Sequence, residues 1–249
     1  MSPRFSLSQG PLILVNRDHP LPCEPEGDTL VPLDSRHPHI LLQRQAAALL
    51  DQLLGAVGGR TAIVPVSGYR PRAEQQAIWE DALAREGRAF TETYVARPGC
   101  SEHQTGLAID LGENRPPIDF LCPAFPDEGV CGAFRRRCAQ FGFVLRYPPG
   151  KEGVTGIGHE PWHFRYVGWP HAWLMERRGM VLEEYIDLLH TYPEQGPHLR
   201  LAIGGRHFEI FHVAQGDLPG LEERLPAGLP CQVSGDNVDG AVVTLWRDA

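Results

Sequence analysis

Two short stretches of the sequence place imidazole and carboxylate side chains at spacings that suit a catalytic metal. His103 and Asp110 are separated by a segment that contains Gly106, and a second imidazole, His163, follows three residues after Glu160. Two imidazole nitrogens and one carboxylate oxygen are a ligand set of the kind that a catalytic zinc ion uses, with the fourth position left for water. We therefore expect His103, Asp110 and His163 to bind one Zn²⁺ ion.

Glu160 is then a carboxylate close to the metal that is not needed as a ligand. Zinc lowers the pKa of bound water towards 7, and a glutamate within hydrogen-bond reach accepts its proton as the water attacks a carbonyl carbon. This chemistry is peptide hydrolysis, with Glu160 as the general base. His159 is a rival ligand because it neighbours Glu160, but it falls in a Gly-rich connector, whereas His163 lies on an expected strand.

The elements that would carry these residues follow from hydrophobic periodicity and turn signals. Arg70 falls at an elbow between an expected strand and an expected helix, and Asp110 falls on one face of a strand that follows Gly106. The pattern predicts helices over residues 41–57, 73–86, 133–141 and 173–191, and strands over residues 62–66, 106–111, 143–147 and 162–166.

Beyond Pro197 the pattern of expected elements changes: strands separated by turn signals replace helices. We predict an α+β fold with two parts. Residues 1–197 form the principal domain, which includes an N-terminal arm with one β-like run at residues 12–15, and residues 198–249 form a small β-rich appendage.

Three ordered motifs resemble the signature of the D-alanyl-D-alanine carboxypeptidases and dipeptidases of the VanY, VanX and VanXY type. They are Ser67-Gly68-Tyr69-Arg70, then Ser101-x-His103 with Gly106 and Asp110, then Glu160-Pro161-Trp162-His163. Because the chain has eleven histidines, the spacings alone also arise by chance, and the ordered match carries more weight. The resemblance implies a hedgehog/D,D-peptidase fold, which is an antiparallel sheet with flanking helices, and a zinc peptidase with the ligands and base named above.

The same resemblance gives roles to four more residues. Arg70 would donate hydrogen bonds to the scissile carbonyl oxygen, as a planar cation aimed at a developing oxyanion. Ser101 and Gln75 would contact the terminal D-alanine of the substrate, and Tyr94 is a further candidate for substrate binding. Each of the last three has a plain structural alternative: Ser101 as a turn cap, Gln75 on a solvated helix face, and Tyr94 in the core.

Other residues near the motifs have structural rather than chemical expectations. Glu102 would point away from His103 in an extended backbone and so lie outside the ligand set, and Trp162 would face the core. Cys100 lacks a free base for thiol catalysis. The later histidines, among them His190 and His212, have no partner spacing, so we expect surface or packing roles for them.

The leading functional hypothesis is a zinc-dependent D,D-carboxypeptidase and dipeptidase that removes terminal D-Ala from peptidoglycan precursor or stem peptides. One alternative is an L,D-carboxypeptidase that trims tetrapeptides, because the metal chemistry is the same and only the pocket differs. A second alternative is a binding module of the hedgehog fold that keeps structural zinc without hydrolysis. Glu160 argues against that module, since a purely structural site does not use a free carboxylate.

The resemblance implies a small peptide substrate ending in D-Ala as the partner, and composition argues against other partners. A net charge of −8 disfavours nucleic acid, whose backbone needs a cationic surface. The apolar run at residues 11–16 is too short for a signal-peptide core or a membrane span, so we expect no membrane span and a cytoplasmic location. The six cysteines lack CxxC pairs and are expected to be reduced. Neither composition nor resemblance defines the oligomeric state.

Overall fold

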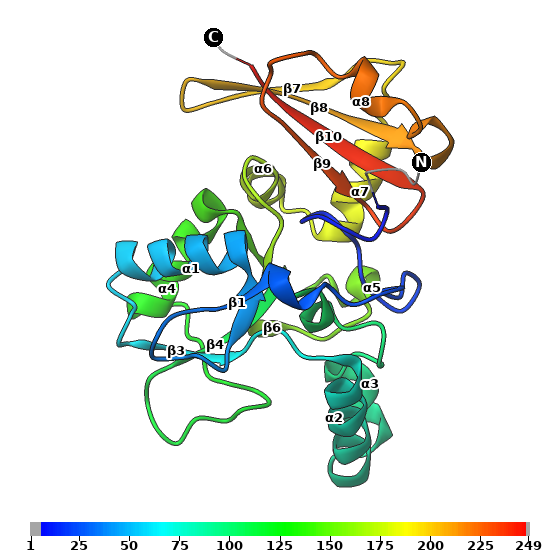
Figure 1. Ribbon diagram of the computed structural model, residues 1–249. Helices are drawn as coiled ribbons and strands as arrows, with labels where there is room; N and C mark the ends of the chain where they lie inside the picture. Colours follow the sequence, from blue (N-terminus) through cyan, green and yellow to red (C-terminus); the bar gives the residue numbers. More distant parts are fainter. Residues whose placement is uncertain (1–5, 248–249) are drawn as a thin grey trace. The chain divides into compact units, whose positions relative to one another are not determined.

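The computed structural model describes residues 6–247 and divides into two compact units. Residues 15–181 form the larger unit (Figure 1). The smaller unit combines the N-terminal segment up to Leu14 with the chain from Leu182 onward. The expected functional division at residue 197 between a peptidase domain and an appendage stays a prediction.

A four-stranded antiparallel sheet organises the larger unit. Its strands are β3 (Ile63–Ser67), β4 (Ala108–Glu113), β5 (Phe143–Tyr147) and β6 (Glu160–Tyr166), in the order β3-β4-β6-β5. A separate antiparallel pair joins β1 (Leu30–Pro32) to β2 (Leu41–Gln43). The helix predicted to begin at residue 41 therefore begins three residues later, because residues 41–43 pair as a strand.

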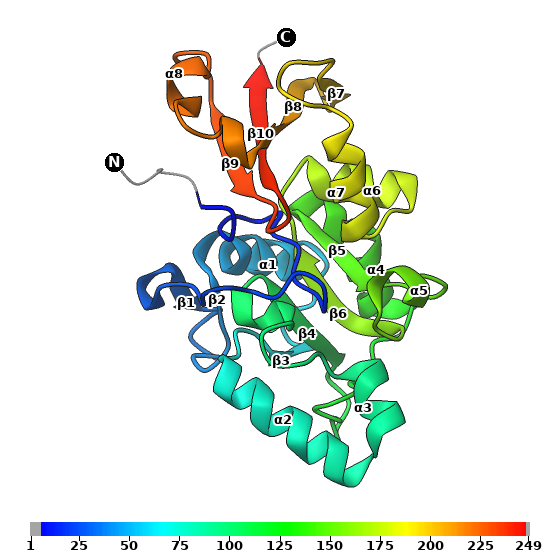
Figure 2. The ribbon, with the colours of Figure 1, turned by 90° about the vertical axis from the view of Figure 1, so that its right-hand side faces the viewer.

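Helices cover this sheet and bury their apolar stripes. Helix α1 (Arg44–Ala56) places Ala46, Leu50 and Leu53 on one face, and all three are fully buried, as the helical period requires. Figures 1 and 2 show α1 over one face of the sheet. The other helices on this core are α4 (Gly129–Arg137) and α6 (His171–Arg178), with the 3₁₀ helix η3 (Cys138–Phe141) between them in sequence.

Helices α2 (Arg72–Arg85) and α3 (Arg88–Tyr94) lie side by side in both views (Figures 1 and 2). Gly87 separates them with a φ of 80°, a conformation that favours glycine. The first of these helices was predicted and the second was not. The remaining short elements of this unit are η1 (Gly27–Thr29), η2 (Glu102–Thr105) and α5 (Glu152–Thr155), the last within the Gly-rich connector.

The single helix predicted over residues 173–191 is wrong, because the chain forms α6 and then α7 (Leu182–His190). Gly179 ends α6 in the left-handed region, with φ 62°, which is the usual role of glycine after a helix. The division between the two units falls in the same short connection. Among residues 6–247, no helix has both the length and the apolar composition needed to cross a membrane.

The smaller unit is a second four-stranded antiparallel sheet with two helices, α7 and α8 (Leu221–Arg224). Its strands are β7 (Leu199–Ile203), β8 (Arg206–Ala214), β9 (Cys231–Gly235) and β10 (Gly240–Arg247), in the order β7-β8-β10-β9, and η4 (Gln215–Asp217) follows β8. Phe211, Leu221 and Val243 belong to its buried core. All four of these strands lie beyond Pro197. The run at residues 12–15 is buried but forms no strand.

Candidate active site

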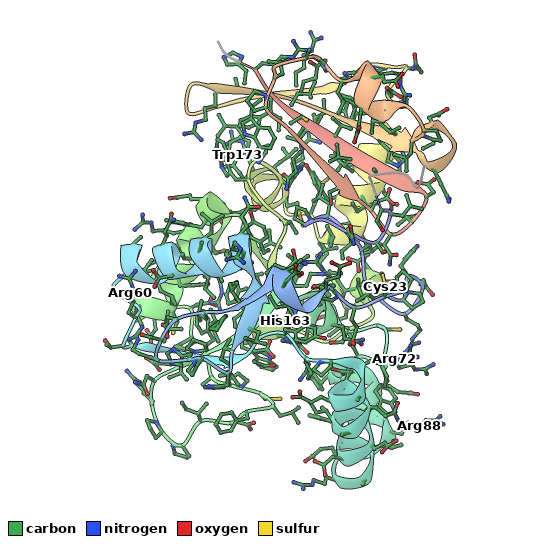
Figure 3. The ribbon with its side chains drawn as sticks, in the orientation of Figure 1. Cys23, Arg60, Arg72, Arg88, His163 and Trp173 are labelled. Carbon is green, nitrogen blue, oxygen red and sulfur yellow. The ribbon has the colours of Figure 1, made fainter. Side chains whose placement is uncertain are left out.

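His103, Asp110 and His163 converge on one point of the larger sheet. Asp110 on β4 is the register partner of His163 on β6, and His103 lies in the 3₁₀ helix η2 just before β4. The Oδ2 atom of Asp110 is 3.0 Å from Nε2 of His103, and its Oδ1 atom is 2.9 Å from Nδ1 of His163. The three side chains are buried, and the candidate ligand atoms lie within 4.8 Å of one another. Figure 3 labels His163 in this group.

Local structure fixes the first two of these side chains. Strand alternation turns Ile109 and Leu111, both fully buried, to the face opposite Asp110. Gly106 joins η2 to β4 with a φ of 68°, and a Cβ there would lie 2.5 Å from Leu30. The Nδ1–H of His103 donates to the Gly68 carbonyl at 2.7 Å, which leaves Nε2 facing Asp110.

An irregularity in strand β6 brings Glu160 to the same cavity as His163. Leu145 pairs with Phe164 but Tyr147 pairs with Glu160, so β6 advances four residues while β5 advances two. In a regular strand, residues three apart face opposite sides of the sheet. Here Glu160 and His163 line one cavity, and Oε2 of Glu160 is 3.7 Å from Nδ1 of His163.

The environment of Glu160 suits a group that gains and loses a proton near neutral pH. Its side chain is buried, and burial raises its pKa; His163 opposes this rise and Asp110 adds to it, with a result of about 8. Glu160 is not among the three clustered ligands. It is therefore a carboxylate beside the candidate metal site that remains available for proton transfer.

Arg70 brings an unused hydrogen-bond donor to the cavity. It lines the cavity from the elbow after β3, and its backbone N–H donates to the His103 carbonyl at 3.2 Å. Its Nε atom is buried and has no hydrogen-bond partner among residues 6–247. Burial lowers the pKa of the guanidinium, and the charge of Asp110 opposes that change. An unpaired buried N–H is costly unless a ligand accepts it, so this donor is placed for a substrate oxygen.

Gln75, Ser101 and Tyr94 line the same cavity. Gln75 is 1% exposed, so it is not on a solvated face; its Nε2 donates to the Ala96 carbonyl at 2.7 Å, and its buried Oε1 has no hydrogen-bond partner within residues 6–247. Ser101 precedes η2 without a side-chain capping hydrogen bond. Tyr94 is 37% exposed and thus not core. These positions fit substrate contacts, and the individual roles stay predictions.

Sequence reasoning missed two aromatic residues that line the cavity, Tyr147 and Trp162. Tyr147 ends β5, and its ring centroid is 4.9 Å from that of His163. The expectation that Trp162 faces the core is wrong, because this residue is partly exposed and lines the cavity. Strand alternation assigned it to the core, and the irregular register of β6 invalidates that assignment. No spacing in the sequence points to Tyr147.

A buried ion cluster lies behind His163. Arg146 Nε and Arg165 Nη1 approach Oε1 of Glu102 at 2.8 and 2.9 Å, and all three side chains are fully buried. Burial raises the pKa of Glu102, but the two guanidinium groups outweigh it and hold the pKa well below its usual range. Glu102 Oε2 is 3.6 Å from Nε2 of His163. A carboxylate behind a ligating imidazole orients the ring, a role that the sequence did not indicate for Glu102.

Two rivals from the sequence lie outside the cluster of ligand atoms. His159 Nδ1 contacts the Tyr147 carbonyl at 2.8 Å, and His159 does not join the other three residues. Cys100 lines a neighbouring pocket, and burial raises the pKa of its thiol. A thiol with a raised pKa is a poor nucleophile.

This fold and site define a class: a peptidase built on the antiparallel sheet of the hedgehog/D,D-peptidase fold. The VanY family, described as D-alanyl-D-alanine carboxypeptidase, matches residues 39–169. The chain belongs to this family.

The relatives agree with that assignment. A protein of Enterococcus gallinarum named bifunctional D-Ala-D-Ala dipeptidase and D-Ala-D-Ala carboxypeptidase VanXYC is 42% identical over 179 residues, which are 72% of this chain and 94% of that protein. The crystal structure of the vancomycin resistance D,D-dipeptidase VanXYg, in complex with a D-Ala-D-Ala phosphinate analog, has a TM-score of 0.91 at 43% identity and covers 97% of this chain and 95% of that one.

Two structures with lower TM-scores match about 70% of this chain. A mutant of the D,D-pentapeptidase VanY from a VanB-type resistance cassette, in complex with Zn(II), has a TM-score of 0.61 at 33% identity, over 71% of this chain and 98% of that one. The LdcB LD-carboxypeptidase has a TM-score of 0.61 at 32% identity, over 70% and 84%. The predicted fold class is confirmed.

Proposed function

We propose that this chain is a zinc-dependent D,D-carboxypeptidase and dipeptidase that removes terminal D-Ala from peptidoglycan precursor or stem peptides. The observation that carries the proposal is the buried group of His103, Asp110 and His163 with Glu160 beside it. The relatives named D-Ala-D-Ala carboxypeptidase and dipeptidase support the substrate class. A cytoplasmic location stays a prediction.

The donor set fits one zinc ion. It offers two imidazole nitrogens and a carboxylate, and the hydrogen bond from His103 Nδ1 to Gly68 directs Nε2 of that ring into the group. On His163 the atom facing the group is Nδ1, with Nε2 turned to Glu102. Zinc at such a site supplies Lewis acidity and lowers the pKa of water in its open position.

The residues of this chain then divide the work of hydrolysis. Glu160 accepts the proton of the attacking water at a carboxylate oxygen and passes it to the leaving amine. Arg70 donates its unused Nε–H to the carbonyl oxygen, where negative charge grows as the water adds. Because the Glu160 side chain and the Nε atom of Arg70 are both buried, little solvent screens either interaction.

The rest of the cavity would hold the end of the peptide. The free Oε1 of Gln75 accepts a hydrogen bond from a substrate N–H, and the Ser101 hydroxyl offers a donor to the terminal carboxylate. Tyr94, partly exposed, would cover the outer part of the substrate. This division of roles among the three residues is part of the proposal.

The alternatives are less well supported. An L,D-carboxypeptidase would share the metal chemistry, but the LdcB structure matches 70% of this chain with a TM-score of 0.61, against 97% and 0.91 for VanXYg. A non-catalytic binding module has no use for Glu160, which is buried beside the ligands with a raised pKa. The first observation favours D,D- over L,D-hydrolysis, and the second favours hydrolysis over binding alone.

The decisive experiment measures D-alanine released by the zinc-loaded protein from three substrates: a pentapeptide ending in D-Ala-D-Ala, free D-Ala-D-Ala, and a tetrapeptide ending in an L,D bond. We expect release from the first two and little from the third. Turnover of the tetrapeptide alone would establish the L,D alternative. If protein that retains zinc releases no D-alanine from any of the three substrates, the non-catalytic binding module is the better explanation.

A further inference from the structure

A second group of side chains that could bind a metal lies in the smaller unit, and it shares no residue with the active-site group. His190 ends α7, His212 lies on β8, and Asp236 and Asp239 belong to the turn between β9 and β10. Their candidate ligand atoms lie within 4.8 Å of one another, the same limit that the active-site group meets. Both histidines were expected to be surface or packing residues because the sequence shows no partner spacing for them, and the structure adds a carboxylate contact to each.

The two imidazoles point at the same carboxylates. Nε2 of His190 and Nε2 of His212 are 3.2 and 3.0 Å from Oδ2 of Asp236, and each is 3.3 Å from Oδ1 of Asp239. The ring centroids are only 4.3 Å apart. Both rings therefore direct Nε2 at the same two carboxylate oxygens, as ligands that share one ion would do.

The turn is built to present these oxygens. Oδ1 of Asp236 accepts backbone N–H groups of Val238, Asp239 and Gly240 at 2.8, 3.1 and 3.1 Å. This fixes the carboxylate and leaves Oδ2 for the two imidazoles. Gly240 keeps the space open, since a Cβ there would lie 2.4 Å from Nε2 of His212.

Charge and burial agree with a bound cation. Asp236 is fully buried and His212 is 6% exposed, whereas the side chains of His190 and Asp239 are 26% and 63% exposed. No arginine or lysine within residues 6–247 forms an ion pair with either carboxylate. Two carboxylates that face two imidazoles, with no arginine or lysine of the described residues paired to them, offer negative charge that a divalent cation would balance.

We propose that His190, His212, Asp236 and Asp239 bind a second zinc ion. Two nitrogen and two oxygen donors suit Zn²⁺, whereas Mg²⁺ and Ca²⁺ take oxygen ligands. Four protein ligands complete a tetrahedron and leave no position for water or substrate. The second ion is therefore structural, and its chemistry differs from that of the three-ligand active site.

The ion would tie together elements that are far apart in sequence. It joins the end of α7 to β8 and to the β9–β10 turn. The same turn holds the N-terminal segment, because the Leu14 N–H donates to the Asp236 carbonyl at 2.8 Å and Asn237 Nδ2 donates to the Leu14 carbonyl at 2.9 Å. Metal binding at this point stabilises the fold of the smaller unit.

The test is the zinc content of the full chain after stripping, reloading and removal of loose metal, measured by elemental analysis. We expect two zinc ions per wild-type chain and one in His190→Gln or in Asp239→Asn. The matched control is His198→Gln, which removes another half-buried imidazole of this unit, one bound to Glu209 at 2.8 Å, and should keep two. The double variant His103→Gln/His163→Gln should keep one.

A second readout separates the sites. With Co²⁺ in place of zinc, the His103→Gln/His163→Gln protein should retain the visible absorption of tetrahedral cobalt, and the further change Asp239→Asn should remove it. Chelation should also lower the melting temperature of that double variant. One zinc per wild-type chain, with none in the double variant, would overturn the proposal and leave a hydrogen-bonded cluster. Because the Asp239 side chain is largely exposed, Asp239→Asn decides the matter if His190→Gln does not fold.

Discussion

Replacing Glu160 by glutamine separates proton transfer from metal binding. The change keeps the volume of a buried side chain and removes only the basic oxygen. General-base catalysis contributes a factor of about 10² to 10⁴, so kcat should fall by that factor, which corresponds to ~3–5 kcal/mol in the activation barrier. Zinc content should not change, because Glu160 is outside the ligand group and its Oε2 atom lies 3.7 Å from Nδ1 of His163.

The assay is D-alanine release under saturating substrate, with zinc measured in the same preparation. KM should change little, since Glu160 acts on the water rather than on the peptide. Glu152→Gln is the control, because it alters an exposed glutamate of the nearby connector that does not line the cavity. A kcat for Glu160→Gln within about threefold of the wild type, given that general-base losses are normally far larger, would refute its role. Loss of zinc would instead make Glu160 a ligand.

Three further predictions concern Arg70, Glu102 and His171. Arg70→Lys should lower kcat by about 10²- to 10³-fold at unchanged zinc content, because an ammonium cannot replace the buried Nε–H, and steady-state kinetics with metal analysis would show it. Glu102→Gln should lower the free energy of unfolding by ~3–5 kcal/mol in denaturant titration, because the buried carboxylate that pairs with two buried guanidinium groups loses its charge. Burial lowers the pKa of His171 to about 3. Below pH 6.5 the unfolded chain therefore binds a proton at this residue that the folded chain does not bind. This difference should lower the free energy of unfolding by about 2 kcal/mol by pH 5, with a further decrease towards pH 3. The part of this slope that comes from His171 should be missing in His171→Gln and present in the exposed-site control His39→Gln, and equal slopes in the two variants would contradict the assignment.

The parts of the fold that sequence reasoning predicted well are those whose signals are local. Strand β5 has the predicted bounds, and helix α1 follows its apolar period. The errors have local causes that depend on packing. Gly179 divides an expected helix because it adopts a left-handed conformation, and residues 41–43 join a strand because a partner strand is present. Residues 12–15 are as apolar as a strand but are buried without one.

The residues of the candidate site show the same contrast between local signals, which the sequence contains, and effects of packing, which it does not. The ordered motifs located His103, Asp110 and His163 because the chemistry of a metal site constrains residue type and spacing together. Trp162 was assigned to the wrong side because alternation fails at the irregular register of β6, and that register cannot be read from the residue types. The role of Glu102 depends on two arginines more than forty residues away in the chain, for which the sequence holds no local signal.

The two metal groups differ in how much of their geometry exists without an ion. Asp110 and His163 are paired across neighbouring strands, and the ladder of the sheet sets their separation. His190 and Asp236 come from a helix end and a turn, which no ladder connects directly to each other. An ion at the first group therefore meets a site that strand pairing has already formed, and its free energy of binding is available for chemistry. An ion at the second group must hold separate elements together, so its binding free energy should appear as stability of the smaller unit.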